Sequence, residues 1–578
     1  MFPKVQTLVA KQVTNSVNNT YGTDINIEKI GINSKGEVVV DGVYIADHHK
    51  DTLIYVHSVR TTILSFRNLL KTNLNFGDLT LTDAKLYVKT HKGEEKDNLS
   101  IFSKKFAPKV PLEDPEPFIL EASTLQLENT LIKITDENLE NPDVLIMDAV
   151  NLSTGHFEIL DINVFADIKH LQFLYNNEIK VEGLSADFKY TEDLIQLNQL
   201  DLKTSESNVE ADVILYFDES GFSDFTNNVV FEADFKNASV ATNDLNYFYD
   251  EFGKNQRIDF SGKLDGPLNN LSLTSLNLQN QTTNIQGDFV FKDLLKDGSV
   301  YEIEANNHKI NSNYFDLRRF MPNILGNLLP KELQQLRDFS FNGTTKITGT
   351  NLDTDLEVNS ALGLVKTKLK MGSIDNVNQA SYKGNVDLRK FNLGKLLGVN
   401  SLGTTTAKLQ FDGKGFSQET INTALSGKIK NFVFNDYNYT NIDVKGTLEN
   451  PIFNGELSIK DPNLKLDFDG LIDVSEDRNI YDFDLQIEYA DLYNTNIFKR
   501  DSISIFTGKI GMDMQGTNVD DVKGVIRISE STYQNLIDDY YFDDILILST
   551  FDEDERTIQI ISPDVVSGKL TGNYLLKD

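Results

Sequence analysis

The feature that most constrains this chain is an alternation of apolar and polar residues that recurs along much of its length. Between Tyr481 and Tyr489 every odd position is apolar, and every even position is acidic or amide-bearing. Successive side chains of a β-strand point to opposite faces of a sheet. This segment therefore predicts a strand with one apolar face and one charged face.

Four further runs, beginning near Leu160, Val209, Val229 and Leu464, repeat the same alternation. Together the five runs span more than half of the chain, so a large one-sided apolar surface has to be covered. We predict that their apolar side chains line one groove and contact lipid. The predicted lining residues are Leu160, Ile162, Val164, Ile168, Val213, Leu215, Phe217, Val229, Phe231, Phe235, Leu464, Leu466, Phe468, Tyr481, Phe483, Leu485, Ile487 and Tyr489.

Composition narrows the class of protein. Apolar residues make up 40% and charged residues 25% of the chain, as in folded rather than disordered proteins. The net charge of -32 argues against nucleic acid and against a broadly anionic membrane surface as partners. The chain has no cysteine, which excludes disulfides and thiolate chemistry. No apolar run approaches the roughly 18 residues of a membrane-spanning helix.

The order of patterns along the chain predicts four regions. Residues 1–22 have the apolar spacing of an amphipathic helix, with Pro3 in its first turn and an end near Gly22. Residues 23–90 read as the first β-hairpins, 91–117 as an exposed loop, and 118–578 as further hairpins. Helical insertions are expected at 243–253 and 315–337, with shorter ones at 391–398 and 418–425.

Strands of about eight residues over half to two thirds of the chain would number roughly 40, more than one flat open sheet accommodates. Three arrangements bury the apolar face: successive β-sandwiches, closed barrels, or a sheet curled into a trough. Sandwiches predict frequent linkers, and residues 91–117 are the one good candidate. Barrels in membranes carry aromatic girdles, and the chain has no tryptophan. We therefore predict an all-β fold: an elongated, curled antiparallel sheet that forms a continuous hydrophobic groove.

The first hundred residues also resemble a known family. The stretches FPKVQTLVAKQVTNSVNNTYGTDINIEKI and VVVDGVYIADHHKDTLIYVHSVRTTI, and above all the D-x-x-x-D-T-L pattern of residues 47–53, resemble the amino-terminal part of TamB-type proteins of the Bacteroidetes kind. These belong to the AsmA-like, repeating β-groove group. Later segments such as FSGKLDGPL and VKGTLENPIFNGELSI resemble that group in their Gly-turn-strand pattern but are less specific.

The resemblance implies a β-groove that is anchored in the inner membrane by one helix and crosses the periplasm. It implies an association with phospholipid movement and with a TamA-like or BamA-like outer-membrane partner. The anchor expected before Pro3 and the carboxy-terminal docking domain are not evident. We therefore expect an amino-terminal fragment of such a protein.

Residues with catalytic or metal-binding chemistry do not form a recognisable motif. His48, His49 and Asp51 are suitable metal ligands, but they lie in one turn with no second cluster in the sequence, so no metal is predicted. The acidic groups around residues 538–544 and 552–555 lack calcium-loop spacing. Phosphate-binding loops and nucleophile elbows are absent from the sequence. We expect no enzyme activity and no cofactor.

Three functions from different classes follow. The first is a non-enzymatic conduit that carries phospholipid acyl chains along the groove between two membranes. The second is a scaffold or chaperone whose strand edges hold unfolded outer-membrane strands. The third is an extracellular adhesive array of β-sandwiches, which predicts separable domains.

Overall fold

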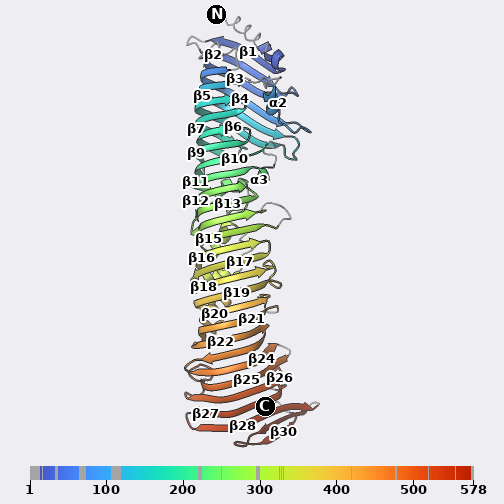
Figure 1. The fold of residues 1–578 in the computed structure, drawn as a ribbon, viewed down its shortest axis with the longest axis vertical. Helices are drawn as coiled ribbons and strands as arrows, with labels where there is room; N and C mark the ends of the chain where they lie inside the picture. The colour runs from blue at the N-terminus through green and yellow to red at the C-terminus, as the bar shows by residue number, and fades with distance from the viewer. Residues whose placement is uncertain are drawn as a thin grey trace, which may run out of the picture. The chain divides into compact units, whose positions relative to one another are not determined.

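The computed structural model describes most of the chain and divides it into two compact units, 1–281 and 282–578. The described residues are 14–15, 17–32, 37–63, 73–105, 119–218, 224–248, 250–293, 300–323, 326, 329, 331–417, 420–449, 451–475, 478–517, 520–552 and 555–573. Each unit is built from strands stacked in chain order (Figure 1).

The described part of the first unit consists of strands, the helical residues 14–15 and 17–21 before β1, and three short helices that follow later in the chain. Its strands are β1 (Asp24–Ile32), β2 (Val38–Ala46), β3 (Thr52–Ile63), β4 (Asn73–Thr90), β5 (Ile119–Asp136), β6 (Asp143–Leu160), β7 (Asn163–Tyr175), β8 (Ile179–Tyr190), β9 (Leu194–Thr204), β10 (Asn208–Tyr216), β11 (Val230–Ala241), β12 (Arg257–Pro267) and β13 (Asn270–Asn280). Its helices are α2 (Asn98–Lys104), α3 (Phe225–Asn228) and α4 (Thr242–Phe248).

The second unit has the same construction. Its strands are β14 (Thr283–Lys292), β15 (Glu302–Asn313), β16 (Asp338–Thr348), β17 (Asn351–Ser360), β18 (Gly363–Gly372), β19 (Ser381–Asn392), β20 (Leu402–Lys414), β21 (Asn422–Phe434), β22 (Tyr437–Glu449), β23 (Ile452–Lys460), β24 (Leu464–Ser475), β25 (Arg478–Asp491), β26 (Ser504–Gln515), β27 (Lys523–Asn535), β28 (Asp539–Asp552), β29 (Glu555–Ile561) and β30 (Gly568–Gly572). Its helical segments are α5 (Tyr314–Phe320), the 3-10 helix η2 (Lys331–Leu336) and α7 (Leu393–Leu397).

Within each unit every strand hydrogen-bonds to the next strand along the chain, so that all strands of a unit lie in one continuous sheet. Among the described residues no strand belongs to a second sheet stacked on the first. The predicted all-β fold with few short helices is therefore confirmed. The described strands number 30 rather than the roughly 40 expected from a typical strand length, because most of them have 9 to 18 residues.

One strand pair departs from the predicted antiparallel pattern. β4 and β5 run parallel, with Leu81 opposite Leu127. A parallel pair needs a crossover connection instead of a hairpin, and the described part of that connection contains α2. The prediction of an exposed loop over 91–117 is therefore wrong for its first part, where Asn98 is buried. Residues 106–117 of that predicted loop lie outside the described residues.

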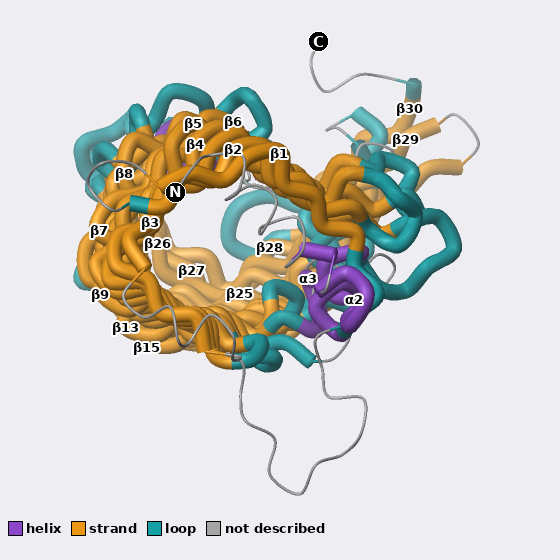
Figure 2. Tube along the Cα trace, turned by 90° about the horizontal axis from the view of Figure 1, so that it is seen from above, coloured by secondary structure: helices purple, strands orange, loops and turns teal. Residues whose placement is uncertain are grey.

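The strands of each unit bend, so that each sheet is curled rather than flat (Figure 2). Register shifts interrupt many of the pairs; the β6–β7 pair alone has three. An extra residue in one strand bends that strand and increases its twist. At one such shift Gln199 has a φ of 50° and donates its backbone N–H to Asp212 Oδ1 at 2.7 Å. Bulges of this kind provide the curvature that the alternating pattern does not specify.

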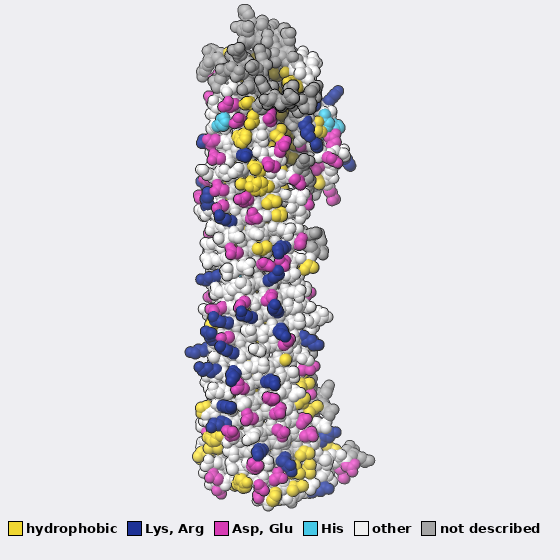
Figure 3. All heavy atoms as spheres, in the orientation of Figure 1, with side chains coloured by type: hydrophobic (Ala, Val, Ile, Leu, Met, Phe, Trp, Pro, Cys, Tyr) yellow, Lys and Arg dark blue, Asp and Glu magenta, His cyan; other side chains and the backbone are white. Residues whose placement is uncertain are grey.

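Acidic and basic side chains are spread along the face in view in Figure 3, with apolar side chains among them. Between β17 and β18 they form a ladder of cross-strand ion pairs, Lys368 with Asp355 at 2.7 Å and Lys370 with Asp353 at 2.9 Å. Opposite charges on directly opposed residues add modestly to sheet pairing. The charged parity of β17 and β18 therefore shares the outer face, and their apolar parity lies on the opposite, inner face.

Some of the predicted helices are present in the structure, and one is not. Residues 14–15 and 17–21 are helical, and the helix ends where Gly22 adopts a φ of 67° and donates its N–H to the Asn18 carbonyl at 2.8 Å. Residues 1–13 of the predicted helix lie outside the described residues. Segments 243–253, 315–337 and 391–398 overlap with α4, with α5 and η2, and with α7, respectively. The helix predicted at 418–425 is wrong, because β21 begins at Asn422. None of the helices in the described part of the chain has the length and hydrophobicity to cross a membrane.

Candidate functional site: an apolar sheet face

The candidate site is the apolar face, which the strand register organises into continuous rows. In the first unit one row crosses every strand from β1 to β13 and consists of apolar residues only. Its members, each opposite the next, are Ile30, Val40, Val59, Leu81, Leu127, Leu152, Leu171, Leu184, Leu202, Val209, Ala238, Phe260 and Leu278. Register therefore aligns the apolar parity of thirteen successive strands.

The second unit has rows of the same kind. One row, from β14 to β25, is Ile285, Ile310, Phe341, Val358, Val365, Leu388, Ala407, Ile429, Ile442, Ile459, Leu466 and Ile487. A neighbouring row, from β19 to β28, is Val386, Leu409, Gly427, Val444, Leu457, Phe468, Leu485, Ile510, Ile528 and Ile545. A one-residue slip in any pair would send the following residues to the charged face.

These rows differ in how far the rest of the chain covers them. The row that ends at Ile487 is partly covered: Leu317 of α5 and Leu336 of η2 pack with Leu388 in one cluster, and Tyr439 packs with Ile442 in another. The neighbouring row is mostly half-buried, with Leu457, Leu485 and similar side chains partly open to solvent. In the second unit the helical insertions therefore cover part of the row that ends at Ile487, and the neighbouring row stays partly accessible.

Most of the predicted lining residues lie on this face. Leu466, Phe468, Leu485 and Ile487 belong to the rows above, and Phe483 and Tyr481 continue the same parity of β25 opposite Gly470 and Ile472. In the first unit further pairs share one face. They are Val164 with Ile159, Val213 with Ala233, Leu215 with Phe231, Phe235 with Ala211, and Ile168 with Ala186. Leu464, which faces Ala490, is buried.

The structure corrects three of the predicted lining positions, Leu160, Ile162 and Tyr489. Leu160 is the last residue of β6 and pairs with Asn163, and Ile162 lies in the following turn with 42% of its surface exposed. Phe217 and Val229 lie just outside β10 and β11, at the parity of Leu215 and Phe231, and are buried as Leu464 is.

Tyr489 follows a register shift in β25 and faces Lys465, so it lies on the charged side, and Ala490 takes the inward place. A bulge reverses the parity after it, and the sequence pattern continues through the bulge without a sign of it.

A surface depression of about 840 Å³ in the second unit is lined by residues of both parities. Charged residues such as Lys428, Asp484, Lys509 and Arg527 line it, and so do Val444, Leu457, Phe468, Leu485 and Ile510 of the neighbouring row. The depression therefore follows the neighbouring row across β22 to β26.

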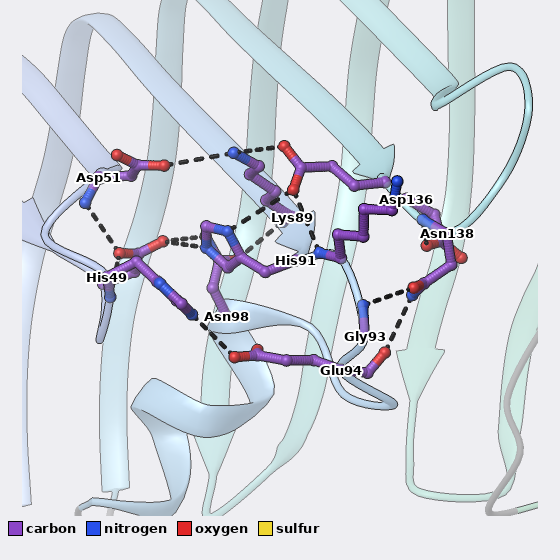
Figure 4. Close-up of polar contacts among 12 residues, drawn as sticks. His49, Asp51, Lys89, His91, Gly93, Glu94, Asn98, Asp136 and Asn138 are labelled. Carbon is purple, nitrogen blue, oxygen red and sulfur yellow. Dashed lines mark hydrogen bonds and ion pairs between the residues drawn. The ribbon is translucent and has the colours of Figure 1, made fainter.

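A polar cluster lies at one rim of the first unit's sheet, where strands begin and end. The β2–β3 turn, the end of β4 with α2, and the β5–β6 turn meet there (Figure 4). Lys89 pairs with Glu137 at 2.7 Å and with Asp51 at 3.3 Å. Asn138 accepts the backbone N–H of Gly93 at 2.7 Å. The sequence singled out the β2–β3 turn alone, because the other members lie more than 35 residues away along the chain.

Asp47 is the buried centre of the polar cluster. Its carboxylate accepts hydrogen bonds from Asn98 Nδ2 and His91 Nε2, both at 3.0 Å, and from the backbone N–H groups of His49 and Asp51. Burial opposes its ionisation, but these donors together lower the pKa of Asp47 to about 2. Asp47 is therefore a fixed negative charge.

Comparison with known proteins gives no further guide to the site. No protein-family model, no curated protein and no solved structure matches this chain. The function therefore has to be argued from the two features described above.

Proposed function

We propose that this chain is a non-enzymatic lipid conduit, in which phospholipid acyl chains lie against the apolar face while their head groups stay in water. The observation that carries the proposal is the continuity of the apolar rows, which run from strand to strand without a charged side chain. A conduit needs such continuity, whereas a pocket for one ligand does not.

The energetics of the apolar face favour an apolar occupant. Contiguous apolar surface beyond a few hundred Å² is uncommon on soluble proteins and marks a binding surface. Each methylene removed from water contributes about 0.8 kcal/mol, so an acyl chain gains affinity in proportion to the length that it lays on the rows. Because strands repeat every ~4.8 Å with similar side chains, successive positions along a row have similar energies. An acyl chain can then move along a row without meeting a deep energy minimum, and no catalytic residue is required.

The resemblance of the first hundred residues to TamB-type proteins supports the same proposal and supplies its setting. It would place the chain in the periplasm as a bridge for phospholipids between inner and outer membranes, working with a TamA-like or BamA-like barrel.

The scaffold alternative needs a free strand edge, and one edge is partly occupied. Asn18, from the helix before β1, accepts the N–H of Ile25 at 2.9 Å and donates to the Ile25 carbonyl at 2.8 Å. A side-chain amide therefore takes the place that an added peptide strand would use at Ile25. At the other end β30 has five residues, a length that limits edge pairing.

Site-specific photo-crosslinking tests the proposal. A photoreactive residue at position 485 faces inward, and one at 486 faces outward opposite Lys509. After gentle purification from lipid-containing cells, we expect lipid adducts by mass spectrometry at 485 and not at 486. Equal labelling at both positions, or peptide adducts alone at 485, would overturn the lipid proposal.

A further inference from the structure

Three histidines come together in the polar cluster, two from the β2–β3 turn and one from the end of β4. The ring centroids of His49 and His91 are 4.0 Å apart, those of His48 and His49 are 4.5 Å apart, and those of His48 and His91 are 5.4 Å apart. Each ring offers a nitrogen within 4.8 Å of the other two. Imidazole nitrogen is the ligand that Zn²⁺, Ni²⁺ and Cu²⁺ share.

Carboxylates contact each of these rings, and His91 has a second carboxylate neighbour, because Glu137 lies 3.9 Å from its Nδ1. Glu94 contacts Nε2 of His48 at 2.9 Å and Nε2 of His49 at 2.8 Å, while Asp47 contacts Nε2 of His91 at 3.0 Å. A carboxylate that fixes one ring nitrogen orients the ring and makes the other nitrogen a better ligand, as in metal-bound histidines generally. All three rings therefore have a supporting carboxylate and a second nitrogen.

The charges around the rings favour a cation. Four carboxylates, Asp47, Asp51, Glu94 and Glu137, contact the rings or their partners. Lys89 offsets part of this charge and is already engaged by Asp51 and Glu137. Lys92, next to His91, also donates its backbone N–H to Glu137 at 3.2 Å. Asp47, Asp51 and His91 also form a second group with metal-ligand spacing. A divalent ion would relieve the excess negative charge and accept the imidazole lone pairs.

Burial gives the cluster a rigid floor and an open entrance. His91 is 7% exposed and Asn98 is 1% exposed, whereas the side chain of His49 is 48% exposed. His91 is thus fixed beneath the two turn histidines, which solvent can reach. The sequence argued against a metal because His48, His49 and Asp51 had no second cluster beside them. His91, which lies 40 to 43 residues further along the chain, supplies the ligand that was missing beside them.

From this geometry we propose that His48, His49 and His91 bind one divalent transition-metal ion of the zinc class. Asp47 and Glu94 act as the supporting carboxylates, and a water molecule is left as an open ligand, as is usual for three-histidine sites. The ion would fasten the β2–β3 turn to the segment that carries α2. This site is independent of the lipid proposal, because it lies at a turn edge and uses none of the apolar rows.

Metal analysis of the full chain, without an affinity tag and stripped by chelator, tests the site. After exposure to Zn²⁺ and desalting, we expect one zinc per chain by elemental mass spectrometry, with raised thermal stability. His49→Gln, at the exposed side of the cluster, should lose this zinc without unfolding the chain. Glu94→Gln should weaken zinc affinity by about 10- to 100-fold, the usual effect of removing a supporting carboxylate.

His170→Gln is the matched control, because His170 is an exposed histidine of β7 in the same unit. It should retain the zinc. The proposal fails if the unaltered chain binds no zinc, in which case the cluster is a hydrogen-bonded clasp alone. It fails equally if His49→Gln and His170→Gln bind zinc alike.

Discussion

A single carboxylate in the middle of the apolar face should slow lipid movement in a way that depends on pH. Leu485 is half-buried and lies between Phe468 and Ile510 of the two neighbouring strands. In Leu485→Asp the new charge would lie about 5 Å from each of them, one strand spacing away. An acyl chain that crosses this point must displace the water around the carboxylate.

The size of the barrier has an upper bound. Covering an unpaired carboxylate costs several kcal/mol, but the group can instead take up a proton, which at pH 7 costs an aspartate about 4 kcal/mol. Each 1.4 kcal/mol of barrier is a factor of ten in rate, so transfer should fall by at most about 1,000-fold. Because an acyl chain can shift sideways toward Phe483 or Ile487, we expect a reduction nearer ten- to a hundred-fold.

The cost of protonating the aspartate also determines the direction of the pH dependence. Protonation becomes cheaper as pH falls, by about 1.4 kcal/mol per pH unit. The transfer defect of Leu485→Asp should therefore shrink between pH 7 and pH 5.5, while the unaltered chain changes little. Transfer of a fluorescent phospholipid between donor and acceptor vesicles measures both quantities.

Gln486→Asp is the control, because it places the same group on the adjacent residue, on the charged face beside Lys509. Circular dichroism and thermal melting should show that both variants remain folded. The reasoning is refuted if the two variants transfer lipid at the same rate, or if the defect of Leu485→Asp stays constant across the pH range.

Three further predictions concern stability. Gly427 has a φ of 148°, and an added Cβ would meet the Lys408 carbonyl oxygen at 2.2 Å. Gly427→Ala should therefore lower the free energy of unfolding by about 1–3 kcal/mol in urea, whereas Gly568→Ala, where nothing lies within 4 Å of the added Cβ, should leave it unchanged. Asn98→Ala removes a buried donor to Asp47, and a loss of about 1–3 kcal/mol should appear as faster amide exchange in α2 but not in α4. Burial and the hydrogen bond to Asp461 raise the pKa of Tyr437 to about 12, so the contact should stabilise the fold below pH 10 and be lost as pH rises toward 12. Tyr437→Phe should remove that alkaline component of thermal stability, and an unchanged alkaline profile would contradict the assignment.

The sequence predicts the fold class and the facing of most strands because both depend on local alternation. Leu466, Phe468, Phe483 and Leu485 lie on the apolar face as predicted, since no bulge separates them from one another in register. Tyr489 does not lie on this face, because a register shift near the C-terminal end of β25 precedes it. That shift depends on the pairing of β25 with β24, and the alternating pattern of the sequence does not indicate it.

The polar cluster could be predicted only in part. His48, His49 and Asp51 stand out as a group within five residues, but their partners His91 and Glu94 come from a segment that the composition suggested was exposed loop. Whether such a segment folds back depends on contacts between distant residues. A buried polar centre such as Asp47 has no periodic pattern that would reveal its donors.

The parallel pairing of β4 and β5 determines which turns become neighbours. In an uninterrupted up-and-down meander, consecutive strands exit at alternating rims, so the exits of β4 and β5 would lie a full strand length apart. Here β5 runs with β4, and both exits reach the rim that already holds the β2–β3 turn. This break in polarity is why Glu137 meets Lys89 and why its N–H donates to the Thr90 carbonyl at 3.0 Å. Replacing the crossover with a tight hairpin would exchange the two rims for every later strand of this sheet and disperse the residues gathered at that corner.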